Sequence, residues 1–132
     1  YQQQLYVMSP MQAHDVLQSA VVDDFDKTIL IESQLIEWQQ TNEKGLKGDV
    51  LSHDVSLGFR QGGERIQLQG QTHHKSLKHL FQQWHIPPWQ RDRIPLVFCD
   101  DKLIAVVGYG VSDEFAVNEG QQGYLPVLKT VR

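Results

Sequence analysis

The chain has 132 residues, of which 40% are hydrophobic and 21% are charged, and its formal net charge at pH 7 is −4. This length predicts one ordinary domain with enough apolar residues for a packed core. No apolar run approaches the roughly 18 residues needed to cross a membrane, so the composition argues against a membrane protein. The single cysteine, Cys99, excludes an internal disulfide and favours a reducing, cytoplasmic environment. We interpret Cys99 as a small buried hydrophobic residue.

Residues 1–56 are predicted to be rich in strands, with a helical turn or two from Met11 to Ala20. The strands are expected at Leu5–Met8, at Thr28–Ile31 and around Ile36–Trp38. Three acidic residues, Asp23, Asp24 and Asp26, precede the second of these strands. Because they lack the glycine and the downstream glutamate of a calcium loop, we interpret them as a solvated turn.

Alternating residues predict a half-buried strand from Val55 to Arg60 and a second from Arg65 to Leu68, separated by Gly62-Gly63. This arrangement indicates a hairpin or a bulged strand, with Arg60 and Arg65 on its polar face. The two glycines do not match a known phosphate-binding loop, so we interpret them as a turn.

One amphipathic helix is predicted with an apolar stripe at spacings of three and four residues, formed by Leu77, Leu80, Phe81 and Trp84. Ser76 directly precedes it and is the expected N-cap. The opposite face carries Lys75, Lys78, His79 and Gln82.

Pro87-Pro88 is expected to end this helix and to begin a second, short one. Trp89 is interpreted as a core anchor beneath this corner, with an exposed stacking residue as the alternative. Asp92 lies between Arg91 and Arg93 and is expected to orient one of them as a fork for phosphate.

The remaining chain is predicted to be mostly strands. Pro95–Cys99 and Lys102–Val107 are expected to form a hairpin around Asp100-Asp101, and both strands are apolar at nearly every position, which is typical of buried central strands. Short strands are expected at Phe115–Val117 and at Leu125–Val131. The fold class is therefore α+β, with layered strands and a few helices.

The positive charge of the chain is concentrated between Phe59 and Pro95. This segment holds six of the twelve Lys and Arg residues and only two acids, so its formal net charge is +4 in an acidic protein. Such clustering suits a polyanion, since each neutralised phosphate releases counterions. The candidate binding residues are Arg60, Arg65, Lys75, Lys78, His79, Arg91 and Arg93, although Arg65 and Arg93 each lie near an acid and are the best candidates for a structural role.

No catalytic centre is predicted, and no metal site. His73, His74 and His79 are not spaced to share one helix face, and neither HExxH nor CxxC occurs. We interpret His79 and His85 as surface residues of the helix that can add charge beside an anion near neutral pH.

Three runs, FRQGGERI, KSLKHLFQQWHIPPWQRDRIPLVF and DDKLIAVVGYGV, resemble the C-terminal region of bacterial tRNA(Ile)-lysidine synthetases. The resemblance covers residues 57–117 well. It implies a layered strand sandwich similar to a domain of the phenylalanyl-tRNA synthetase β chain. It also implies that this C-terminal domain holds the tRNA body and acceptor stem. It also implies that the full-length enzyme uses ATP with Mg and L-lysine to convert the wobble cytidine of tRNA(Ile) to lysidine.

The resemblance assigns that chemistry to an N-terminal ATP-pyrophosphatase domain with an SGGxDS loop, which is absent from this sequence. Because the chain begins at Tyr1, we expect a piece of a longer cytoplasmic protein. We expect this chain to be one domain with a strand-rich leading part (1–56), a family core (57–117) and a closing strand (118–132). The expected partner is tRNA(Ile), with no membrane and with a possible homodimer of the full-length protein. The alternatives are a protein-interaction or dimerisation module that uses the same basic face, and a free-standing small enzyme.

Overall fold

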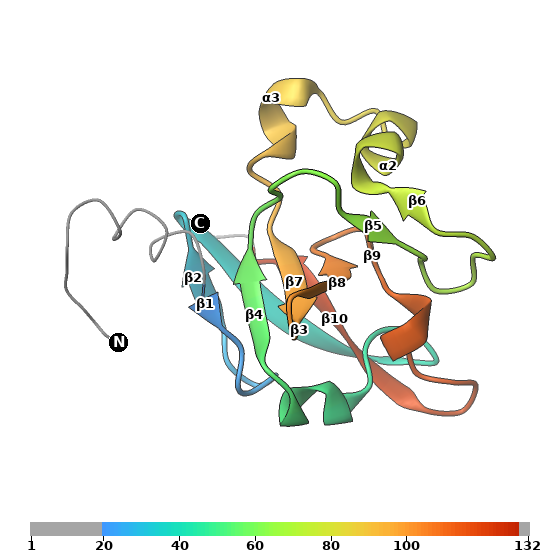
Figure 1. Ribbon diagram of the computed structural model, residues 1–132. Coiled ribbons are helices and arrows are strands. Elements are labelled where there is room, and N and C mark those ends of the chain that lie inside the picture. The colour runs from blue at the N-terminus through green and yellow to red at the C-terminus, as the bar shows by residue number, and fades with distance from the viewer. Residues whose placement is uncertain (1–19, 130–132) are drawn as a thin grey trace.

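A computed structural model of the chain describes residues 20–129, which form two antiparallel sheets with helices above them (Figure 1). The strand expected at Leu5–Met8 lies outside these residues. So does the helical turn expected from Met11 to Ala20, except for Ala20 itself, which begins β1.

The first sheet has five strands, in the order β1 (Ala20–Val21), β4 (Val55–Gly58), β7 (Leu96–Cys99), β8 (Lys102–Val106) and β9 (Gly110–Val111). The second has three, in the order β10 (Gln122–Leu128), β3 (Gln34–Asn42) and β2 (Ile29–Ile31). A separate pair consists of β5 (Arg65–Ile66) and β6 (Lys75–Ser76). The helical elements are α2 (Leu77–Gln83), α3 (Pro88–Arg91) and the 3-10 turns η1 (Gly48–Ser52) and η2 (Asp113–Phe115).

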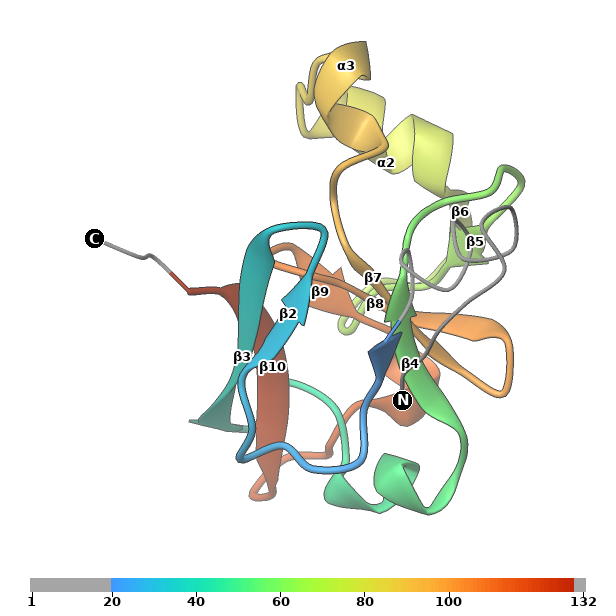
Figure 2. The same ribbon diagram turned by 90° about the vertical axis from the view of Figure 1, so that its left-hand side faces the viewer.

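The two larger sheets face one another and enclose the main hydrophobic core (Figure 2). From the three-stranded sheet, Ile36 and Trp38 point into this core, and from the five-stranded sheet Leu57, Val97 and Ile104 meet them. The expected α+β fold with layered strands is thereby confirmed.

A second core lies on the other face of the five-stranded sheet, beneath α2. Leu77, Leu80 and Phe81 of this helix pack with Leu96 and Val106 of the sheet. Successive residues of β7 therefore alternate between the two cores and β8 contributes residues to both, which explains why both strands are apolar at nearly every position. The predicted β7–β8 hairpin is confirmed, with Asp100 and Asp101 at positive φ in its turn.

The amphipathic helix is also confirmed, from Leu77 to Gln83. Ser76 caps it as predicted, because its hydroxyl oxygen accepts a hydrogen bond of 3.1 Å from the backbone N–H of His79. Pro87 then precedes the short helix α3, with Pro88 in its first turn.

Replacing Ser76 with alanine is expected to lower the free energy of unfolding by about 1 kcal/mol, since one N–H at the start of α2 loses its acceptor. Ser76→Asn restores an acceptor and is expected to recover most of the loss. Urea unfolding followed by circular dichroism measures both variants. Equal stability of Ser76→Ala and wild type would show that solvent replaces the cap at no cost.

Two predicted strands are corrected. The segment beginning at Arg65 does not pair with β4, whose two edges are already occupied by β1 and β7. It pairs instead with β6, nine to eleven residues further along the chain. The strand expected at Phe115–Val117 is replaced by the turn η2 and one isolated bridge between Ala116 and Leu46.

No helix within residues 20–129 is long and apolar enough to cross a membrane.

Candidate nucleic-acid interface

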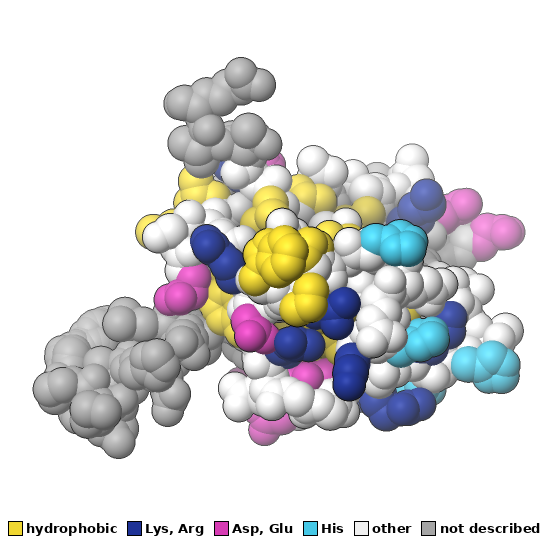
Figure 3. All heavy atoms as spheres, turned by 90° about the horizontal axis from the view of Figure 1, so that it is seen from above, with side chains coloured by type: hydrophobic (Ala, Val, Ile, Leu, Met, Phe, Trp, Pro, Cys, Tyr) yellow, Lys and Arg dark blue, Asp and Glu magenta, His cyan; other side chains and the backbone are white. Residues whose placement is uncertain are grey.

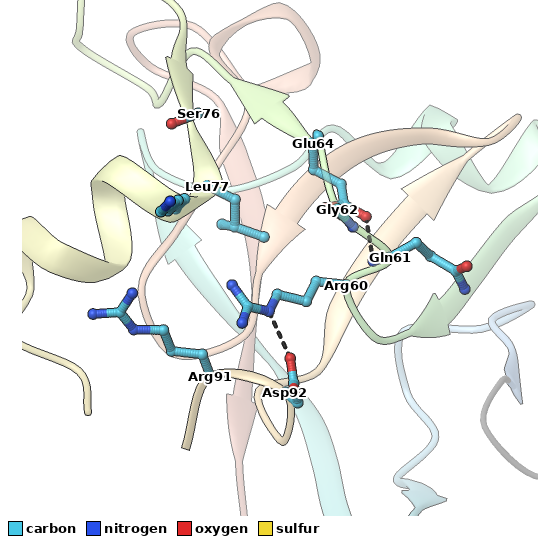
Figure 4. Close-up of a pocket in the computed structure, with 10 residues that line it drawn as sticks. Arg60, Gln61, Gly62, Glu64, Ser76, Leu77, Arg91 and Asp92 are labelled. Atoms are coloured by element: carbon cyan, nitrogen blue, oxygen red, sulfur yellow. Dashed lines mark hydrogen bonds and ion pairs between the residues drawn. The ribbon is translucent and has the colours of Figure 1, made fainter. Parts of the chain in front are cut away.

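An open groove of about 580 Å³ lies where the loop after β4, the start of α2 and the end of α3 converge. Figure 4 shows the side chains that reach it from these three elements. Its lining residues are Arg60, Gln61, Gly62, Gly63, Glu64, Ser76, Leu77, Lys78, Arg91 and Asp92. Three cationic side chains thus meet in one concave surface, although they are separated by up to 31 residues in the sequence.

Arg60 connects the loop after β4 to the end of α3 and to α2. Its Nε donates a 2.6 Å hydrogen bond to Oδ1 of Asp92, and its guanidinium carbon lies 5.6 Å from the centroid of the Phe81 ring. The side chain of Arg60 is 27% exposed, whereas that of Asp92 is 75% exposed. Because the pair is so open to solvent, it contributes little to stability and serves mainly to hold the arginine in place.

The carboxylate of Glu64 holds the loop that follows β4 in a closed turn. The backbone N–H groups of Gln61 and Gly62 donate hydrogen bonds of 2.6 and 3.0 Å to the two carboxylate oxygens of Glu64. Gly62 and Gly63 have φ of 113° and 82°, which only glycine adopts without strain. The predicted turn is confirmed, and the N–H groups of Gln61 and Gly62 are already used within the chain. The sequence analysis assigned Glu64 no role, although its position directly after the two glycines was the available signal.

Lys78 and Arg91 supply the other two positive charges of the groove. Lys78 is exposed on the outer face of α2, as its place in the helical pattern predicted. Arg91 is held by its Nε, which donates a 2.8 Å hydrogen bond to the carbonyl oxygen of Ile86. This bond leaves the two terminal nitrogens at the far end of the guanidinium, beside the groove.

The remaining predicted residues surround the groove without lining it. Arg65 is exposed and donates through Nη2 to the carbonyl oxygen of His74, at 3.3 Å. Lys75 lines a separate hollow with His73 and Gln83. His79 is exposed on α2. Arg93 lines a further hollow beside Arg60, and Gln34 from β3 donates a 2.8 Å hydrogen bond to its carbonyl oxygen.

Two expectations about the Pro-Pro corner are wrong. Asp92 binds Arg60 rather than orienting Arg91 or Arg93, because the loop after β4 approaches α3 in the folded chain. Trp89 is not a core anchor, since it is 76% exposed. The apolar space beneath the corner is instead filled by Ile86, which is 5% exposed and belongs to the second core.

A mixed group of potential metal ligands lies at the other end of β4 from Arg60. The ligand atoms of His53, Cys99 and Asp100 are within 4.8 Å of one another, and Nδ1 of His53 is 3.1 Å from Oδ2 of Asp100. Burial, followed by the nearby charges of Asp100 and Asp54, raises the pKa of the Cys99 thiol. A thiol held protonated is a poor metal ligand, and Cys99 is buried as predicted.

The described residues thus define a sheet-dominated α+β domain with a cationic groove on the helical side of its larger sheet. In the view from above, Lys and Arg side chains gather on this side together with a few acids and a hydrophobic patch (Figure 3). Such a surface can hold an anion by charge and hydrogen bonding.

Residues 55–128 match the family described as the TilS substrate C-terminal domain, and the chain belongs to this family. The resemblance inferred from the three sequence runs is confirmed, and the family match extends past residue 117 into β10.

Two similar proteins carry the same name. The chain is 54% identical over 74 residues to a tRNA(Ile)-lysidine synthase of Legionella pneumophila strain Paris and 34% identical over 122 residues to that of Coxiella burnetii. These matches cover 54% and 91% of this chain, but only 17% and 27% of the two relatives. The chain therefore spans a small part of the relatives' length.

A solved structure described as the TilS C-terminal domain has a similar fold. It superimposes with a TM-score of 0.65 over 87% of this chain and 99% of its own length, at 22% sequence identity. The likeness supports the arrangement of sheets and helices.

Proposed function

We propose that this chain is the tRNA-holding domain of a tRNA(Ile)-lysidine synthase and carries no catalytic residues itself. The observation that carries the proposal is the meeting of Arg60, Lys78 and Arg91 in one groove of a domain that belongs to this family. The full-length enzyme, in the cytoplasm, then uses ATP with Mg and L-lysine to convert the wobble cytidine of tRNA(Ile) to lysidine. That reaction takes place in a part of the protein outside this chain.

The physical basis is the way in which proteins hold a double-stranded RNA stem. An A-form stem has a deep, narrow major groove, so proteins contact its phosphates, its 2′-hydroxyls and its overall shape. A rigid scaffold that presents several cations suits such a partner. In this domain the cations are borne by α2 and α3 and by a loop anchored to α3 through Asp92, and α2 rests on the second core. The acceptor stem of tRNA(Ile) is the substrate region that we propose for this surface.

Binding of tRNA(Ile) is expected to weaken steeply with salt. If about four cations contact phosphates, the slope of log K against log salt concentration is near −3 to −4. Gel-shift titrations at several salt concentrations measure this slope, with an unrelated tRNA as a second ligand and an acidic domain of equal net charge as a control. Affinity no greater than that of the control domain would refute the proposal. A concentration-dependent dimer in light scattering, with no affinity for RNA, would favour the protein-interaction alternative.

A further inference from the structure

Trp89 is the most exposed large aromatic side chain among residues 20–129, at 76%. The other two tryptophans are used by the fold. Trp38 is 9% exposed in the main core, and Trp84 stacks on Tyr109 with ring centroids 4.6 Å apart. Burial of an indole ring would stabilise the folded state by about 2–3 kcal/mol, and a ring that stays in water forgoes most of this stabilisation.

The backbone that carries Trp89 is firmly held. Pro87 and Pro88 restrict φ immediately before it, and the N–H of Gln90 donates a 3.0 Å hydrogen bond to the carbonyl oxygen of Pro87. The side chain of Arg91 binds the carbonyl oxygen of Ile86 and so braces the corner from within. The ring is therefore presented on a rigid turn, so a partner that covers it orders little additional backbone and the entropy cost of binding is small.

Charge complementarity identifies the partner. Trp89 belongs to the same short helix as Arg91, which lines the cationic groove, and Arg93 follows two residues later. The surface seen from above combines a hydrophobic patch with Lys and Arg side chains (Figure 3). An exposed ring on the same short element as cations is suited to single-stranded nucleic acid, because a base can stack on the ring while the cations follow the backbone.

The ring also restricts where on an RNA it can act. Within a stem each base face is covered by its neighbours, so an indole plane can stack only where a base is unpaired or the helix ends. We propose that Trp89 stacks on an unpaired nucleotide next to a stem whose phosphates occupy the groove of Arg60, Lys78 and Arg91. This inference rests on the proposed function and specifies its substrate class as RNA with a junction between stem and single strand.

Two RNA hairpins with the same stem and tetraloop test the inference on the 132-residue chain. One has a blunt end and the other a four-nucleotide 3′ extension with 2-aminopurine at its first position. The wild-type chain is expected to quench the 2-aminopurine fluorescence and to bind the extended hairpin about tenfold more tightly than Trp89→Ala does. Trp89→Phe is expected to recover most of this difference, because it keeps a stacking ring.

Controls separate stacking from charge and from folding. Lys78→Glu is expected to weaken binding of both hairpins by the same factor, and circular dichroism verifies that the Trp89 variants remain folded. Equal affinity of wild type and Trp89→Ala for the extended hairpin would overturn the stacking while leaving the proposed function intact. No binding of either hairpin above a charge-matched control would overturn both. Loss of self-association by Trp89→Ala at unchanged RNA affinity would overturn the stacking and assign the ring to a protein interface.

Discussion

Replacing Phe81 with alanine is expected to lower the free energy of unfolding by about 3–5 kcal/mol. Phe81 is completely buried between α2 and the five-stranded sheet, and its ring also lies under the guanidinium of Arg60. Truncation leaves a cavity that the surrounding side chains fill only in part. Since a domain of this size is stable by only about 5–15 kcal/mol, the loss is a large fraction of the total.

His79→Ala is the matched control, because it lies on the exposed face of the same helix. Its effect is expected to stay within about 0.5 kcal/mol. Urea denaturation followed by circular dichroism and by tryptophan fluorescence compares the two variants. The Phe81 variant is also expected to lose affinity for RNA, since α2 carries one wall of the groove. Similar stabilities for the two variants would mean that the second core does not hold the helix.

Lys78→Glu is expected to weaken RNA binding by roughly tenfold at physiological salt, because one phosphate contact is lost and a repulsive charge replaces it. The magnitude of the salt slope is expected to fall by about one. Lys78 is exposed on α2 and lines the groove with Arg60 and Arg91, so the change leaves both cores untouched. Gel-shift titration at several salt concentrations measures affinity and slope together.

Lys44→Glu makes the same change of charge in the loop between β3 and η1, outside the groove. It is expected to weaken binding less than threefold, by the long-range field alone. Equal effects of the two variants would show that RNA responds only to net charge. Lys75→Glu extends the test across α2, since Lys75 lines a hollow of its own. A strong effect of this third variant would widen the RNA-binding surface to both sides of the helix.

The periodic segments of the fold were predictable because their signals are local. The stripe of α2 and its Ser76 cap follow from spacings of three and four residues, and the β7–β8 hairpin from two apolar runs around a two-residue turn. The partner of β5 was not predictable in this way. Its pairing depends on which strand edges remain free once β1 and β7 have joined β4, and no local pattern records that.

The candidate site shows the same division. By itself, the sequence determined the family, the concentration of positive charge between Phe59 and Pro95 and the outward position of Lys78, since composition, a long specific motif and helical periodicity lie in the chain itself. Only the tertiary structure decided that Asp92 binds Arg60, that Glu64 fills its own glycine loop and that Trp89 faces solvent. These outcomes depend on which side chains lie within reach of one another once distant segments meet in the folded chain, and Ile86 occupies the place that Trp89 was expected to fill.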